Sequence, residues 1–285
     1  MKNNLLENYK QRCKVLDRIE KYESLGGEYF FLDVEDDPPS QTLMPNDVDY
    51  LNKKLSSKIK NLCALKMAKK MQKIVTKQFN ITIEGLENAR NIKGGAVLTS
   101  NHFSIYENVA VMNVAEEIAP KKKFYRVIRE GNYFMPGKIG FLLKHANTLP
   151  LSSNPKTMMN FNRSIDKLLS DGNLVLVYPE QSMWWNYKKI RPFKMGAFHF
   201  AVRNKVPVIP CFTTLKENGK LDENGMPSYD YTIHVLKPIY PILNLPIKEA
   251  SKIMADENFR QCKEKYEEVY KTPLIYKNQR KEIYA

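Results

Sequence analysis

A histidine followed closely by a glutamate is the feature of this sequence best able to do chemistry. The run GAVLTSNHFSIYE places Asn101 and His102 where an apolar segment stops, and Glu107 stands five residues after the histidine. On a regular helix five residues turn through about 500°, so the two side chains would not share a face. They meet only if His102 lies in a bend before the helix. A carboxylate on the imidazole would then fix its tautomer and leave the other nitrogen free to accept a proton from a hydroxyl.

A second interpretation of these residues needs no catalysis. Ser104 and Glu107 also form the S-x-x-E pattern of a capping box, in which the two side chains bind backbone amides of a first helical turn. The spacing leaves both interpretations open. The other histidines have no carboxylate at a comparable spacing, and we expect them to be structural: His145, His199 and His234.

The elements that must position this pair alternate in type from residue 80 onward. This alternation predicts an α/β fold with a mixed, largely parallel central sheet flanked by helices, in which catalytic groups gather at the carboxyl ends of strands. We find no internal repeat. The expected strands are 81–85, 95–100, 123–128, 148–151, 173–179, 206–215 and 231–239, and the expected helices are 104–118, 136–144, 156–170, 195–204 and 248–270.

Residues 1–79 are expected to form an N-terminal helical extension of the domain at 80–285. A charged helix over 3–23 ends before Gly26 and Gly27, and the proline-containing stretch 35–46 is an expected connector. Asn46 is expected to cap a lysine-rich amphipathic helix over 47–77. Such a helix lies in the interface of an anionic bilayer or packs one stripe on a core with its lysines in water, and the sequence leaves both open.

The composition points to an anionic partner. The chain has 285 residues, 43% of them hydrophobic, which excludes global disorder. Its formal net charge of +14 suits an anionic membrane surface, nucleic acid, or acidic carriers and substrates. No apolar run is long enough to span a bilayer, and the N-terminus lacks the apolar centre of a secretion signal. We therefore expect a cytoplasmic protein that associates peripherally with the inner face of the membrane.

Four short blocks then carry a resemblance to a known family. N-H-F-S-I-Y-E at 101–107 resembles the N-H-x-x-x-x-D signature of the glycerolipid (lysophospholipid) acyltransferase family. V-Y-P-E at 177–180 is similar to its F-P-E-G block, and F-K-M-G-A-F at 193–198 to its F-K-x-G-x-F block. V-P-V-I-P at 206–210 resembles its closing block. The blocks stand in the family's order, and the resemblance covers about residues 80 to 240.

The resemblance implies an acyl transfer without a covalent enzyme intermediate. His102 takes the role of general base, Glu107 orients it, and an acceptor hydroxyl attacks the thioester of acyl-CoA or of an acyl-carrier protein. The thioester is a co-substrate, so the resemblance implies no cofactor, and no metal ligands are evident. The remaining residues expected to bind substrate are Asn101, Glu180, Gln181, Trp184, Arg191, Lys194 and Gly196.

Several of these positions depart from the family pattern. Glu107 replaces the usual aspartate and adds one methylene, and Gln181 replaces the family's glycine. Arginines that in the family bind the acceptor phosphate are missing after Gln181 and around 147–151, although Arg191 and Lys194 offer substitute charge. The adjacent Trp184 and Trp185 suit stacking on a sugar ring, anchoring among lipid headgroups, or packing in a core.

Glu180 has two possible roles, and Gly196 has one that depends on its backbone geometry. Glu180 follows an apolar strand, and it either binds the acceptor or serves as a cap or salt-bridge partner. Gly196 follows Lys194 in a turn into the next helix, where a glycine allows backbone to approach a ligand closely.

The leading hypothesis is thus an acyltransferase acting on a lysophospholipid-like acceptor. One alternative keeps the chemistry but acts on a glycolipid or cell-envelope acceptor, and another is a peripheral membrane protein that retains the fold without turnover. Nucleic-acid binding is motivated by composition alone, by the net charge and the aromatic content of 11%, because the sequence has no zinc-ligand spacing or base-stacking motif. We therefore expect a lipid acceptor and no nucleic acid.

Overall fold

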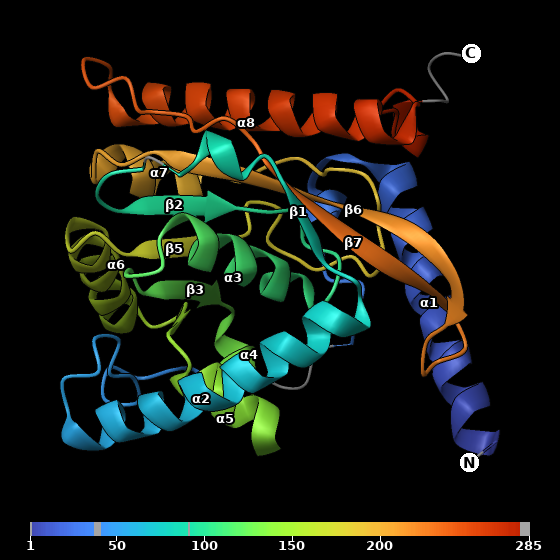
Figure 1. The fold of residues 1–285 in the computed structure, drawn as a ribbon, viewed down its shortest axis with the longest axis horizontal. Coiled ribbons are helices and arrows are strands. Elements are labelled where there is room, and N and C mark those ends of the chain that lie inside the picture. Colours follow the sequence, from blue (N-terminus) through green and yellow to red (C-terminus); the bar gives the residue numbers. More distant parts are fainter. Residues whose placement is uncertain (1, 37–40, 91, 280–285) are drawn as a thin grey trace.

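The computed structural model describes residues 2–36, 41–90 and 92–279, and a seven-stranded sheet forms its centre (Figure 1). The strands lie in the order β1-β7-β6-β2-β5-β3-β4. All neighbouring pairs are parallel except β6 and β7, which form an antiparallel hairpin. The predicted mixed, largely parallel sheet is confirmed. The strands are β1 (Thr82–Glu84), β2 (Ala96–Thr99), β3 (Phe124–Ile128), β4 (Thr148–Pro150), β5 (Leu174–Val177), β6 (Val208–Leu221) and β7 (Pro227–Val235).

Helices cover both faces of this sheet, and the central strands are buried accordingly. Side chains alternate along each strand, so Val97 and Val175 face one layer while Leu98 and Leu176 face the other. The first layer contains α6 (Pro155–Ser170), α7 (Gly196–Arg203) and α8 (Ile247–Tyr270), and the second contains α3 (Glu107–Ile118).

The carboxyl ends of β2 and β5 lie side by side in the middle of the sheet. Thr99 at the end of β2 pairs with Val177 at the end of β5. The loop 100–106 after β2 and the loop 178–195 after β5 therefore leave the sheet at the same edge. This adjacency brings the blocks at 101–107 and 177–180 together.

The lysine-rich helix, α2 (Leu55–Gln78), starts later than predicted. Its small residues Ala64 and Ala68 pack on α5 (Gly137–His145), which follows the short helix α4 (Glu130–Tyr133). Asn46 does not cap it. Instead Asp49 accepts the backbone N–H groups of Lys53 and Lys54 at 2.9 Å, and this carboxylate delays the first helical turn. Of the expected connector 35–46, residues 37–40 lie outside the described residues.

The N-terminal segment packs on the loop after β5. It consists of α1 (Lys2–Leu25) and the 3-10 helix η1 (Gly27–Phe31). Phe30 stacks on Trp184 with ring centroids 5.8 Å apart. One buried cluster joins side chains of both regions: Val15, Ile19, Phe30, Val34, Trp184, Phe212 and Cys262. The first 36 residues therefore share a core with the sheet domain.

Two further boundaries differ from the predicted ones. α3 begins at Glu107 and not at residue 104, because the preceding residues form the bend that the histidine and glutamate require. β6 continues past Leu215 to Leu221, since its outer half pairs with β7 in a hairpin that apolar periodicity did not reveal. A short 3-10 helix, η2 (Leu86–Asn88), follows β1.

Candidate active site

His102 lies in the bend between β2 and α3, at the carboxyl edge of the sheet. Its Nδ1 is 2.7 Å from Oε1 of Glu107, and its side chain is 21% exposed, whereas that of Glu107 is 1% exposed. An ionised carboxylate only accepts hydrogen bonds, so Nδ1 carries the proton and the lone pair of Nε2 is free. The structure thus brings the two side chains together in the way that their spacing required.

The second oxygen of Glu107 binds backbone. Its Oε2 accepts the N–H of Ser104 at 2.9 Å, which is the glutamate half of a capping box. The hydroxyl of Ser104 accepts the N–H of Tyr106 at 3.1 Å, one residue earlier than a regular capping box. The carboxylate of Glu107 therefore binds the backbone of the bend and also holds the imidazole, so the two interpretations of the sequence are compatible.

Tyr178, which the sequence analysis did not select, stacks on the histidine. The ring centroids of His102 and Tyr178 are 4.0 Å apart and the planes differ by 13°. Tyr178 follows β5 directly and precedes Pro179. An aromatic residue just past a buried strand, within the block V-Y-P-E, was the available signal for it.

Glu180 holds the backbone of the histidine. Its Oε2 accepts the N–H of His102 at 3.0 Å and lies 2.9 Å from a terminal guanidinium nitrogen of Arg191, and its Oε1 accepts the N–H of Arg191 at 2.8 Å. Glu180 is 1% exposed and Arg191 is 0% exposed. The expectation that these two side chains contact the substrate is therefore corrected: both are enclosed, and they act on the histidine through its backbone.

Arg191 ties this loop to the N-terminal segment. Its guanidinium also donates to the carbonyl oxygen of Phe30 at 2.7 Å and to Oγ of Ser182 at 2.9 Å, and it lies over the ring of Trp184 at 4.7 Å. Burial lowers the pKa of Arg191 and the adjacent Glu180 opposes that shift. An arginine keeps its proton across the working range of enzymes, so the pair is a buried ion pair.

Asn101 is also enclosed, at 1% exposure. Its side-chain amide donates to the carbonyl oxygen of Thr213 at 2.9 Å and accepts the N–H of Thr213 at 2.8 Å. Both polar groups of the amide are thus used on β6, next to β2. The expectation that Asn101 binds substrate is corrected, because its side chain anchors the bend to the neighbouring strand.

Trp184 packs inside the protein. It is 0% exposed, and its indole N–H donates to the carbonyl oxygen of Leu32 at 3.0 Å. Its backbone N–H donates to the carbonyl oxygen of His102 at 2.9 Å. Of the three interpretations of this aromatic pair, the structure selects packing for Trp184, so this residue offers no face to a sugar ring or a bilayer.

The last three expected site residues are more accessible. Gln181 is exposed and has a φ of 65°, in the left-handed region that favours glycine. Lys194 makes a 2.7 Å ion pair with Glu28, so its charge is partly engaged. Gly196 opens α7, is exposed, and a Cβ there would meet no atom within 4 Å. The space before Gly196 is open to a ligand, although internal packing does not require a glycine.

The other histidines have structural surroundings or lie elsewhere. His234 is buried, with Nε2 3.0 Å from the hydroxyl of Thr214. Burial and the nearby Lys60 and Lys144 lower the pKa of His145. His199 lies on α7. None of the three has the buried carboxylate of Glu107 beside it.

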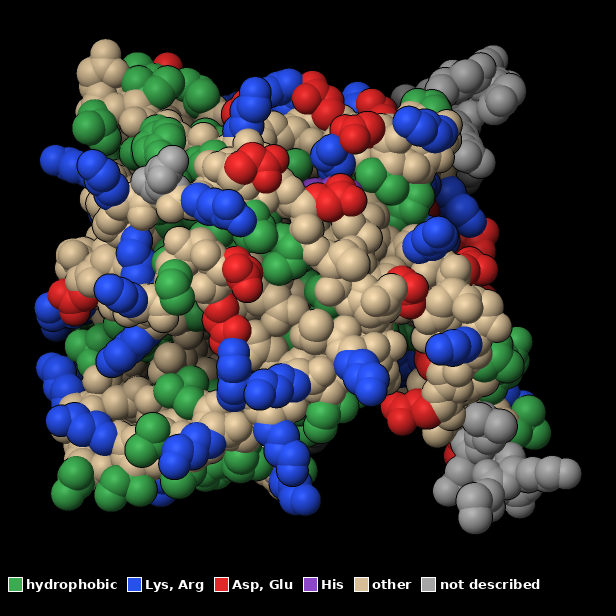
Figure 2. Space-filling view, in the orientation of Figure 1, with side chains coloured by type: hydrophobic (Ala, Val, Ile, Leu, Met, Phe, Trp, Pro, Cys, Tyr) green, Lys and Arg blue, Asp and Glu red, His purple; other side chains and the backbone are tan. Residues whose placement is uncertain are grey.

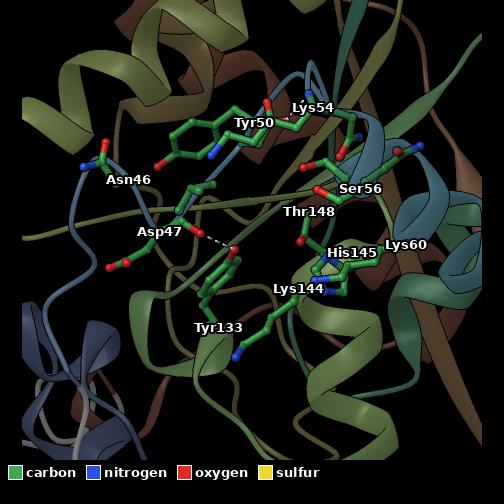
Figure 3. Close-up of a pocket in the computed structure, with 15 residues that line it drawn as sticks. Asn46, Asp47, Tyr50, Lys54, Ser56, Lys60, Tyr133, Lys144, His145 and Thr148 are labelled. Carbon is green, nitrogen blue, oxygen red and sulfur yellow. Dashed lines mark hydrogen bonds between the residues drawn. The ribbon is translucent and has the colours of Figure 1, made fainter.

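A separate polar pocket of about 190 Å³ lies between the segment preceding α2 and the end of α5 (Figure 3). Both acids of the pocket already accept hydrogen bonds from backbone. Asp49 accepts the N–H groups of Lys53 and Lys54, and Asp47 accepts the N–H of Met44 at 2.8 Å. None of the expected site residues lines it, so it is distinct from the histidine site. Its charged lining residues are Asp47, Asp49, Lys54, Lys60, Lys144 and His145.

Comparison with known proteins supports the assignment of the domain. Residues 80–214 match the family model described as Acyltransferase. The matched segment includes both loops that meet at His102. The segment that is similar to the acyltransferase family therefore contains the candidate site, while α1 and α2 lie outside the match.

Two curated plant proteins are similar to part of this chain. A chloroplastic 1-acyl-sn-glycerol-3-phosphate acyltransferase of Brassica napus is 26% identical over 167 residues, covering 57% of this chain and 46% of its own. One from Arabidopsis thaliana is 28% identical over 148 residues, covering 52% and 39%. This chain therefore spans less than half the length of these curated relatives.

A solved structure shares the fold. The crystal structure of PlsC, a 1-acyl-sn-glycerophosphate (LPA) acyltransferase from Thermotoga maritima, matches with a TM-score of 0.50. The match covers 69% of this chain and 78% of that chain at 18% identity. At this identity the likeness concerns the arrangement of helices and strands.

Proposed function

We propose that this protein is an O-acyltransferase that moves a fatty acyl chain from a thioester to a hydroxyl of a 1-acylglycerol-3-phosphate or a similar lysophospholipid. The observation that carries the proposal is the 2.7 Å contact between Nδ1 of His102 and the buried Glu107, at the carboxyl edge of the acyltransferase domain. The names of both plant relatives support the choice of acceptor.

The proposed chemistry follows from the free nitrogen of the imidazole. Nε2 of His102 takes the proton of the acceptor hydroxyl as its oxygen attacks the thioester carbonyl carbon. The imidazolium that forms is balanced by Glu107, whose charge has no lysine or arginine within 4 Å among the described residues. When the intermediate collapses, the C–S bond breaks, and the imidazolium returns its proton to the thiolate. The products are an ester and a free thiol.

The test is release of free thiol from a long-chain acyl thioester. Acyl-CoA and acyl-carrier protein are offered in parallel as donors, with 1-acylglycerol-3-phosphate and a total lipid extract as acceptors. His102→Ala should lower turnover by about 10²- to 10⁴-fold, the usual contribution of a general base. His199→Ala, which removes a histidine on α7, is the matched control and should keep normal turnover.

Thiol release by His102→Ala at the normal rate would overturn the mechanism. Consumption of neither donor would favour a protein that retains the fold without activity. If only the lipid extract serves as acceptor, mass analysis of the product names the acceptor and shows whether it is a glycolipid.

We also propose that α2 rests on an anionic membrane surface, on the cytoplasmic side. The helix buries Ala64 and Ala68, so its large apolar residues point outward: Leu55 is 73% exposed and Ile59 and Leu62 are each 57% exposed. Figure 2 shows hydrophobic side chains with lysines among them along the lower edge, where Figure 1 places α2. Exposed apolar residues flanked by lysines suit the interface of an anionic bilayer. No helix within the described part of the chain is long and apolar enough to cross a membrane.

Sedimentation with vesicles tests this surface. The protein should bind vesicles rich in anionic lipid more tightly than zwitterionic vesicles, and more tightly than an oligonucleotide at the same salt. Equal binding to the oligonucleotide would favour a general polyanion site. The variant on α2 changes Lys66, Lys70 and Lys73 to Glu, and the matched control makes the same changes on α8 at Lys248, Lys252 and Lys263.

A further inference from the structure

Tyr178 stacks on the proposed base, yet the proposed chemistry gives it no role. Its ring covers one face of the imidazole of His102 at 4.0 Å between centroids, while Glu107 binds one edge. Rotation of the imidazole about its bond to Cβ would lose both contacts. The two neighbours together thus fix the direction in which Nε2 points.

The hydroxyl of Tyr178 is buried and makes no hydrogen bond to the residues that the structure describes. Such unpartnered groups are rare in protein interiors and are commonly found at functional sites. Burial raises the pKa of this phenol well above its ordinary value, the carboxylate of Glu107 adds to the shift, and the guanidinium of Arg126 opposes it. Tyr178 is therefore protonated whenever the protein is folded and active.

Arg126 is the cation whose charge opposes the rise in the pKa of this phenol. It lies on β3 and donates to Oδ1 of Asn108 at 2.8 Å and to the carbonyl oxygen of Ala146 at 3.0 Å. The thiol of Cys211 on β6 also faces the group, and burial raises the pKa of Cys211 to about 12, so the thiol is neutral. The phenol thus feels two opposite charges, the carboxylate of Glu107 and the guanidinium of Arg126.

Two departures from the family blocks meet at this point. Glu107 stands where N-H-x-x-x-x-D has an aspartate, and Tyr178 stands where F-P-E-G has a phenylalanine. One change adds a methylene to the acid, and the other adds a hydroxyl to the ring that stacks on the same histidine. In this structure the carboxylate of Glu107 and the ring of Tyr178 both contact the imidazole of His102.

We propose that Tyr178 is a positioning residue for His102, and that its hydroxyl is matched to the longer acid Glu107. The inference rests on the proposed function, because it describes how the base of that reaction is held. The ring keeps the imidazole in its plane. The O–H group, free of other partners, turns toward the carboxylate and stabilises its ionised form, which weakens the pull of Glu107 on the imidazolium.

Two substitutions separate the ring from the hydroxyl. Tyr178→Phe keeps the stacked ring, so kcat should stay within about threefold. The acidic limb of the kcat/KM profile should move to higher pH by about 0.5 unit, because a carboxylate without the nearby hydroxyl holds the imidazolium more strongly. Tyr178→Leu removes the ring face, and kcat should fall by about tenfold or more with little change in KM. Tyr125→Phe, a buried tyrosine on β3 in the opposite layer, is the matched control and should change neither quantity.

A double-mutant cycle tests the match between the two residues. Glu107→Asp withdraws the carboxylate by one methylene and should lower kcat by about 10²-fold. In that background the carboxylate is drawn away from Tyr178 and its influence on the hydroxyl weakens, so adding Tyr178→Phe should cost nothing or restore part of the activity. The two effects should therefore be non-additive.

The outcomes distinguish this inference from the proposed function. An unchanged pH profile for Tyr178→Phe together with additive effects in the cycle would overturn the matched pair, and equal kcat for Tyr178→Leu and Tyr178→Phe would overturn the role of the ring. Neither result would touch acyl transfer by the unaltered protein. If no thioester is consumed, the imidazole of His102 is titrated by NMR in each variant, and a midpoint unmoved by Tyr178→Phe would overturn the inference without any turnover.

Discussion

Two buried glutamates flank His102, and they have opposite roles. Glu107 and Glu180 are each 1% exposed, and each accepts a backbone N–H near the histidine. Glu180 also faces the guanidinium of Arg191, whereas among the described residues Glu107 has no ion-pair partner but the imidazole, which is charged only when protonated. The charge of Glu180 is therefore already balanced, while that of Glu107 is balanced only when the histidine takes up a proton.

Burial and residue type therefore do not by themselves identify a catalytic acid. A carboxylate paired with an arginine is a stable structural group, because neither partner titrates near neutral pH. A carboxylate paired with a histidine responds to each proton transfer. We therefore propose that the loop 101–107 carries the chemistry and that the loop 180–191 supports its backbone.

The largest effect is expected on the free energy of unfolding, when the ion pair between Glu180 and Arg191 is broken. Arg191→Met leaves Glu180 as an uncompensated buried charge, and it should lower the free energy of unfolding by about 3 to 5 kcal/mol. Unfolding in urea measures this loss. The double variant Glu180→Gln with Arg191→Met removes both charges and should regain part of it. If Arg191→Met were as stable as the unaltered protein, the pair would not support the loop.

The next largest effect is expected on kcat, when Glu107 is changed and Glu180 is left intact. Glu107→Gln should lower kcat by about 10²- to 10³-fold, since the imidazolium loses its counter-charge. Its free energy of unfolding should change by less than that of Arg191→Met, because no buried cation is left behind. Thiol release and urea unfolding on the same preparation measure both quantities. A large loss of stability with normal kcat would reverse the two roles.

A smaller effect is expected where the supporting loop meets the N-terminal segment. Trp184→Phe keeps an aromatic ring against Phe30 but loses the hydrogen bond to Leu32, and it should lower the free energy of unfolding by about 1 to 2 kcal/mol. The value of kcat at a temperature where the variant is folded should be nearly unchanged. A specific loss of kcat would show that this contact reaches the base.

The smallest expected effect on stability is at the start of α7. Gly196→Ala has open space and an ordinary φ, so its free energy of unfolding should change by about 0.5 kcal/mol or less. The value of KM for donor and acceptor then reports whether substrate approaches this backbone. A raised KM for one substrate would place that substrate before Gly196, and unchanged KM values for both would place the two elsewhere.

Much of the fold and the reacting pair was predictable from local patterns. Runs of apolar residues gave most strands within a few residues, and the five-residue spacing of His102 and Glu107 required the bend that the structure contains. The start of α2 was not predictable in this way, because the carboxylate of Asp49 binds the N–H groups of Lys53 and Lys54 in the segment just before the helix. The length of the β6–β7 hairpin depends on pairing between strands, which one strand's periodicity does not record.

The sequence by itself determined which chemical groups stand at the ends of β2 and β5, because residue order and apolar patterning are local properties. Only the tertiary structure decided which way those groups face. Asn101 turns to Thr213, Trp184 to Leu32, and Arg191 to Phe30, all distant in the chain. A polar side chain enters the interior only where a partner from elsewhere satisfies it, and the partner's position is fixed by the packing of the whole fold.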